Sequence, residues 1–136
     1  MAISARLTAT AVVDHLDGTS GVTAYLSQGP TPPAGLTVVV HPDAGQHDGP
    51  LGNPDRDLRL EFQTTSIGVT AEQALWVHDQ VAAQLWRQTI TIDGSTATLP
   101  VHAIPGSEQP VRRDDALASP LFYVTCSWIA HARPTT

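Results

Sequence analysis

Lysine is missing from this 136-residue chain, and charged residues of any kind make up only 15% of it. All seven basic residues are arginines, against thirteen acidic residues, so the net charge is −6. Nucleic-acid-binding proteins usually carry a basic stripe, whereas the single basic pair here, Arg112–Arg113, is followed at once by Asp114–Asp115. The composition therefore argues against binding to phosphate backbones. It is compatible with a surface that repels DNA, because like charges repel.

Cysteine is almost absent as well. With Cys126 alone, the chain has neither an internal disulfide framework nor a cysteine-rich zinc site. Cys126 stands in an apolar stretch, which predicts a small buried thiol and not a nucleophile. No apolar run reaches membrane-spanning length, and the first ten residues lack an apolar segment of signal-peptide size. We therefore expect the protein in the cytosol or assembled from it.

Aromatic residues are few, at 5% of the chain, so threonine, valine and alanine must supply most of the packing. The length fits one domain covering residues 1–136. A core built from such small side chains is thin. We therefore expect the fold to gain stability from contacts with neighbouring subunits.

Hydrophobic periodicity predicts two helices and a set of short strands. One helix is expected from Ser4 to Leu16, and a second from an N-cap at Thr70, with Gln73 completing a capping box, to about Arg87. The strands are expected at residues 22–26, 36–40, 57–68, on both sides of Asp93–Gly94, and at 121–130.

The turn signals predict how these strands connect. A proline-rich segment between residues 26 and 36 suggests a hairpin with a long tip, and Asp93–Gly94 is a strong signal for a second, tighter hairpin. Residues 57–68 alternate apolar and polar side chains, as in an antiparallel strand with one face in water. The expected fold is α+β, a mostly antiparallel sheet with two helices packed on one face.

Residues 41–55 contain mainly glycine, proline, aspartate, asparagine and histidine, and we expect them to form a long acidic loop projecting from the fold. His41, Asp43, His47 and Asp48 crowd this loop, and imidazole with carboxylate suits zinc. Their spacing matches no known ligand pattern, so no metal is predicted. A small metal-binding domain or enzyme using the His41/His47 loop is the alternative of another class.

Motifs for catalysis are missing. The chain has no G-x-S-x-G elbow and no glycine-rich phosphate loop. We therefore predict no catalytic residues, no cofactor and no enzyme activity.

The second predicted helix has a histidine on its apolar side and a tryptophan on its polar side. At ~100° per residue, His78 falls among apolar side chains, whereas Trp76 falls on the opposite, polar side. His78 is expected to bond a backbone carbonyl at the edge of the core. Trp76 either lies flat on its own helix or anchors a neighbouring subunit, since tryptophan is enriched at interface hot spots.

The stretch "LRLEFQTTSIGVTAEQALWVHDQVAAQL", beginning at Leu58, and the later "IPGSEQPVRRDD" and "PLFYVTCSWIAHARP" have a recognisable arrangement. They resemble a strand, a helix crossing the sheet, a proline-glycine loop with an arginine turn, and a final strand. In this arrangement the chain is similar to the tail terminator (tail completion) proteins of long-tailed bacteriophages. The N-terminal helix, paired strands and acidic loop fit the same order. The resemblance extends over the whole chain in element order and over somewhat more than half in pattern.

The resemblance implies a structural virion protein, typically a hexameric ring, at the head-proximal end of the tail tube. The ring stops polymerisation of the tube and joins it to the head. Its partners would be other copies, the tail-tube protein and a head–tail connector protein, with DNA passing through unbound. A head–tail connector (head completion) protein is the related alternative.

The predicted site residues follow from this interpretation. The candidate subunit interface comprises Trp76, Gln73, Gln80, Ala83, Arg112 and Arg113. The candidate channel-lining residues are Asp43, His47, Asp48 and Asp55.

Overall fold

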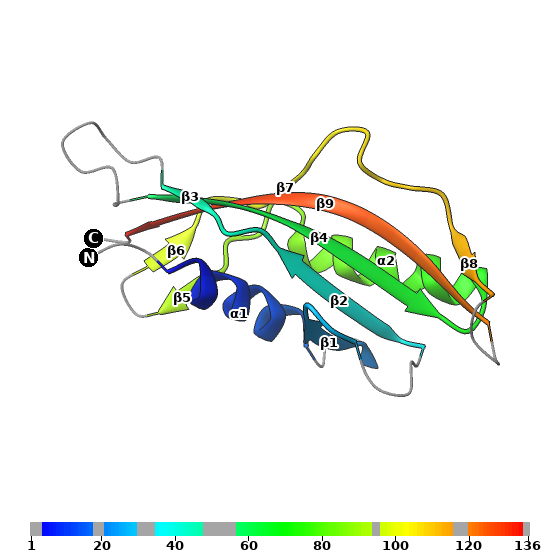
Figure 1. Cartoon of the computed structure of the whole chain (residues 1–136). Helices are drawn as coiled ribbons and strands as arrows, with labels where there is room; N and C mark the ends of the chain where they lie inside the picture. The colour runs from blue at the N-terminus through cyan, green and yellow to red at the C-terminus, as the bar shows by residue number, and fades with distance from the viewer. Residues whose placement is uncertain are drawn as a thin grey trace.

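The computed structural model describes residues 4–17, 21–29, 35–47, 57–93, 96–115 and 120–134 (Figure 1). Its two helices within these ranges are α1 (Ala5–Leu16) and α2 (Ala71–Leu85). The strands are β1 (Thr23–Leu26), β2 (Thr37–Pro42), β3 (Gln46–His47), β4 (Leu58–Gly68), β5 (Thr91–Asp93), β6 (Thr96–Thr98), β7 (His102–Ala103), β8 (Arg112–Asp114) and β9 (Leu121–Pro134).

Strands β4 and β9 form the centre of the sheet and run side by side along its length (Figure 1). They pair antiparallel from Leu58↔Ala132 to Gly68↔Phe122. The main strand order is β1-β2-β4-β9-β6-β5, while β3 pairs with β4, and β7 and β8 pair with β9. β9 therefore has one continuous neighbour along one edge and three short ones along the other.

Both helices cover the same face of this sheet. Alternate side chains of β4 are buried, beginning with Leu58, Leu60 and Phe62, as the sequence predicts. The core cluster joins residues of α1, α2, β2, β4 and β9, among them Val12, Val81 and Trp128. The predicted α+β fold, with a mostly antiparallel sheet and two helices on one face, is confirmed.

The opposite face of β4 and β9 is covered by no helix of the described residues. We call it the outer sheet face, and it carries mostly polar side chains. Those from the two central strands include Arg59, Glu61, Gln63, Tyr123, Thr125 and Ser127.

The predicted hairpin of the first two strands is wrong. β1 and β2 pair in parallel, from Thr23↔Thr37 to Leu26↔Val40. Positive φ angles at Ser27 (62°) and Leu36 (54°) turn the chain at both ends of the connection, which lets it return to the starting end of β1. Proline and glycine predict that the chain turns there, but they do not predict its final direction.

The acidic stretch is also less irregular than predicted. His41 and Pro42 extend β2 along β4, and β3 pairs with Arg59 and Leu58. The backbone of residues 41–43 and 46–47 thus pairs with β4, although these side chains lack an apolar pattern. Asp48 and Asp55, together with the rest of the predicted projection, lie outside the described residues.

Toward the C-terminus, the β5–β6 hairpin around the predicted turn is confirmed, with Thr91 paired to Ala97. The connection after residue 104, where no strand is predicted from the sequence, contains β8, which pairs with β9. α2 ends at Leu85 instead of the predicted Arg87. Arg87 has a positive φ of 58°, outside the helical range.

Within the described ranges, neither helix has the length and apolar composition that a membrane crossing requires.

Candidate functional site

The orientation of α2 is fixed by its first turn. Thr70 Oγ1 accepts a hydrogen bond from Gln73 N (3.0 Å), and Gln73 Oε1 accepts one from Val69 N (2.8 Å). This reproduces the predicted capping box, except that the glutamine reaches the residue before the N-cap. Gly68 passes so close to the helix that a Cβ there would lie 2.3 Å from Ala74 N. The junction therefore determines which side of α2 meets the sheet.

The inner side of α2 is apolar apart from one histidine. It buries Ala74, Val77, His78, Val81 and Leu85. His78 is 8% exposed, and its Nε2 lies 3.4 Å from Glu108 Oε2. The prediction that His78 bonds a backbone carbonyl is therefore wrong, because its partner is a carboxylate from the connection between β7 and β8. His78 Nδ1 is buried and has no hydrogen-bond partner among the residues that the structure describes.

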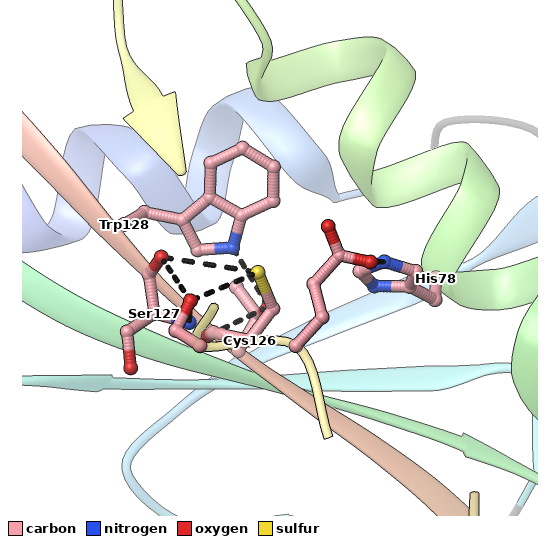
Figure 2. Close-up of polar contacts among 7 residues, drawn as sticks. His78, Cys126, Ser127 and Trp128 are labelled. Atoms are coloured by element: carbon pink, nitrogen blue, oxygen red, sulfur yellow. Dashed lines mark hydrogen bonds and ion pairs between the residues drawn. The ribbon is translucent and has the colours of Figure 1, made fainter. Parts of the chain in front are cut away.

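The connection between β7 and β8 lies beside the middle of β9 and forms hydrogen bonds with it, as a neighbouring strand would. Ser107 Oγ donates to Ser127 O (3.2 Å) and accepts from Ser127 N (3.1 Å), so one hydroxyl pairs with both backbone groups (Figure 2). Ile104 N donates to the same Ser127 carbonyl at 2.8 Å, and Gln109 N donates to Thr125 O at 3.0 Å. The connection is thereby attached to β9, and Glu108 is positioned toward α2.

Cys126 lies behind this attachment, between β9 and the helices. Its Sγ is 3.7 Å from Ser107 Oγ, and the residue is 1% exposed. Burial raises the pKa of the Cys126 thiol, and the negative charge of Glu108 adds to that effect, while the hydrogen bond from Ser107 opposes it. A raised pKa favours the neutral thiol at pH 7, which is a poor nucleophile. The buried thiol predicted from the sequence is confirmed.

Trp128 fills the centre of the same region and is 2% exposed. Its Nε1 donates to Thr64 Oγ1 on β4 at 3.1 Å (Figure 2). A buried indole N–H needs such a partner, because an unpaired buried donor is costly. The polar groups of Thr64, Ser107, Glu108 and Ser127 thus support packing in this region.

The outer side of α2 has the reverse character. Leu75, Trp76 and Trp86 are 47%, 41% and 45% exposed, and Val69, just before the helix, is 54% exposed. Trp76 lines a shallow recess together with Leu36 from the start of β2. Apolar area is therefore left uncovered along this side within the described part of the chain.

Two carboxylates flank Trp76 on the same stripe of the helix. Glu72 and Asp79, four residues before and three after it, are exposed, and neither pairs with a basic group among the described residues. α2 itself contains no arginine. Its outer side is thus both apolar and acidic.

The six predicted interface residues do not share one surface. Ala83 is exposed near Trp76, while Gln73 and Gln80 lie half-buried at the flanks of the helix. Arg112 and Arg113 are consecutive in β8, so their side chains point to opposite faces of the sheet. The two arginines therefore face different sides of the sheet, and the six residues together remain a predicted interface.

Arg112 belongs to the outer sheet face. It lies opposite Tyr123 and lines an open recess there. The lining of this recess, named here the Arg112 recess, is Gln63, Ser107, Gln109, Arg112, Tyr123, Thr125 and Ser127. No carboxylate of the described residues pairs with Arg112, whereas Arg113 binds Asp115 at 2.7 Å and Arg59 binds Glu61 at 2.8 Å.

The described members of the predicted channel loop are exposed. Asp43 Oδ1 accepts from Gly45 N (2.8 Å), which stabilises a turn, and His47 lies in β3. Asp48 and Asp55 fall outside the described residues. Among the residues that the structure does describe, no three histidine, cysteine or acidic side chains gather closely enough to hold a metal ion.

Sequence patterns did not identify Ser107, Glu108 or Thr64 as partners of the core. The length of the final strand was nevertheless a signal that the preceding connection would pair with it, since a long strand needs hydrogen-bond partners along both of its edges.

Comparison with protein-family models and with curated proteins finds no match for the chain.

Proposed function

We propose that this protein is a structural subunit of a closed ring and, more specifically, a bacteriophage tail terminator. The ring would sit at the head-proximal end of the tail tube, end the growth of the tube and join it to the head. The observation that carries the proposal is the uncovered apolar side of α2, from Val69 to Trp86.

Exposed tryptophan is informative because it is costly to leave in water. Removing apolar surface from water contributes about 25 cal/mol per Å², and Trp76 and Trp86 are 41% and 45% exposed. The helix that carries Trp76 is capped and fixed to the sheet, so the Trp76 surface is rigid. Trp86 directly follows the helix, and its ring meets His102 edge-on with ring centroids 6.3 Å apart. Buried tryptophans often dominate binding energy at interfaces. These features support an interface between subunits on this side.

A ring needs two different surfaces that meet head to tail. The fold supplies two candidates on opposite sides of the molecule, the outer side of α2 and the outer sheet face. One is apolar and acidic, and the other is polar with an unpaired arginine. Two unlike surfaces suit a cyclic contact better than a symmetric dimer.

The charge of the chain supports a passive channel. The net charge of −6 would repel DNA, so a duplex could pass without adhering. Exposed Asp43 and His47 remain proposed channel residues, together with Asp48 and Asp55 from the same acidic stretch.

The resemblance to tail terminators provides further support. It rests on a strand leading into a helix that crosses the sheet and on a long final strand. β4, α2 and β9 have this order, with β4 and β9 paired along the whole length of β4.

The purified protein tests the proposal directly. We expect rings of one defined size in negative-stain electron microscopy and light scattering, either alone at high concentration or on adding tail-tube protein from the same genome. Tubes capped by the protein should stop elongating. A monomer at every concentration that leaves tube length unchanged would contradict the proposal, as would the absence of a tail-tube gene near its own.

A further inference from the structure

Arg112 is the one charged side chain among the described residues that line the Arg112 recess, and no described carboxylate pairs with it. The other lining residues offer hydroxyl and amide groups and the phenol ring of Tyr123. Arginine at such a position suits a carboxylate, which it can bind through two parallel hydrogen bonds. Its planar group can also stack on an aromatic ring. The chemistry of the recess therefore fits a ligand that combines a carboxylate with an aromatic side chain.

The outer side of α2 offers this combination. Glu72, Trp76, Asp79 and Ala83 form one exposed stripe, named here the Trp76 ridge. Their spacing of four, three and four residues keeps them on one line along a helix. The 15-residue helix spans about 22 Å at a rise of 1.5 Å per residue, long enough to lie across several strands of a sheet.

Within one molecule these two surfaces cannot meet, because the sheet itself separates them. α2 packs on the face of β4 and β9 that buries Phe62 and Trp128, whereas Arg112 lines the recess of the opposite face with Thr125 and Ser127. A contact between them requires a second copy. In a pair joined in this way, one copy keeps a free recess and the other keeps a free ridge. Further copies can therefore add head to tail, and the assembly closes into a ring when the rotation between copies permits it.

We propose that the Trp76 ridge of one copy docks in the Arg112 recess of the next, with a ridge carboxylate bound to the Arg112 guanidinium. Trp76 then lies against the Arg112 and Tyr123 side chains. This assignment rests on the ring-forming function proposed above, and it names the two surfaces that form the ring.

Charge reversal at both surfaces tests the pairing. Arg112→Glu is expected to weaken self-association by about tenfold or more, because coupling between close interfacial charges typically reaches this size. Glu72→Arg and Asp79→Arg should also weaken it. Combining Arg112→Glu with whichever ridge reversal has the larger effect should recover most of the lost association, measured by sedimentation velocity at low salt.

Arg113→Glu is the matched control. It makes the same change of charge one residue away, on the other face of the sheet, and should leave association unchanged. Wild-type association in the Arg112→Glu variant, or loss of rings with Arg113→Glu alone, would overturn the assignment. The proposed ring function would then stand, with its interface elsewhere.

Crosslinking distinguishes failure of the interface from failure of the function. In a Cys126→Ala background, Ala83→Cys with Thr125→Cys places one thiol on the ridge and one in the recess, and it keeps both ridge carboxylates. Mild oxidation should give a ladder of covalent multimers, whereas either single cysteine gives at most dimers. A ladder without wild-type rings would support the contact and contradict the ring function. If no ladder forms, the contact itself is refuted.

Discussion

The two sides of helix α2 reverse the usual distribution of residue types. The inner side buries a histidine among aliphatic residues, while the outer side exposes Leu75 and Trp76 beside two carboxylates. His78 is tolerated inside because the connection after β7 brings Glu108 to it. Nothing in the described chain covers Trp76 in the same way. The inner side of α2 therefore stabilises the fold. The exposed apolar residues of the outer side are the reason for the proposal that this side binds another subunit.

The largest loss of stability is expected when a buried side chain on the inner side of α2 is truncated. Leu85→Ala removes a side chain that is 0% exposed and should lower the free energy of unfolding by about 2–5 kcal/mol. Urea denaturation followed by circular dichroism measures the change. Leu75→Ala, on the outer side of the same helix, is the control and should cost much less. Equal losses would mean that both sides of α2 are packed.

A smaller loss is expected where the connection is attached to β9. Ser107→Ala removes the hydroxyl that pairs with both Ser127 N and Ser127 O. Leaving a fully buried donor unpaired costs about 1–3 kcal/mol, and the partly buried Ser127 N should cost about 1 kcal/mol, at the lower end of that range. Thermal unfolding should show this decrease, with Gln109→Ala as the control because that residue contacts β9 through its backbone. An unchanged transition would show that water replaces the hydroxyl.

The buried thiol of Cys126 should make the stability of the fold depend on pH. Since burial raises the pKa of Cys126 above its ordinary value of 9.0, the folded state holds the proton more tightly than the unfolded state. Stability is therefore unaffected by this group below the ordinary pKa and falls as pH rises above it. Cys126→Ala should lose less stability than wild type between neutral and alkaline pH. Rapid reaction of the native thiol with Ellman's reagent at pH 7 would contradict this burial.

The smallest effect on folding is expected on the outer side. Trp76→Ala should change the free energy of unfolding by less than about 0.5 kcal/mol, the usual range for surface substitutions. The same variant should assemble poorly, as judged by light scattering. A destabilised monomer would instead mean that Trp76 packs on its own helix and recess, the alternative that the sequence left open.

Several local features could be predicted because their causes are local. Thr70 and Gln73 cap the second helix through side chains three residues apart, and β5, which ends at Asp93, pairs with β6. Alternation along residues 58–68 gave the buried side of β4 correctly. In each case the determining interaction lies within a few residues, so spacing and residue type are sufficient.

The candidate site was predictable only in part. Trp76 was correctly placed on the outer side of the helix, because the helical period determines on which side of the helix each side chain points. The opposite directions of the Arg112 and Arg113 side chains were not foreseen, because strand β8 was not predicted and strand geometry sends neighbours to opposite faces. The partner of His78 was missed because Glu108 lies thirty residues away in sequence.

The α+β class, the two amphipathic helices and the main alternating strand follow from local sequence patterns, because periodicity and capping act over short distances. Tertiary structure alone decided that β1 and β2 run parallel, that β9 collects three short partners along one edge, and that Glu108 meets His78. These outcomes depend on backbone pairing between segments far apart in the chain. A backbone hydrogen bond is open to almost any residue, so no residue type reveals the partner in advance.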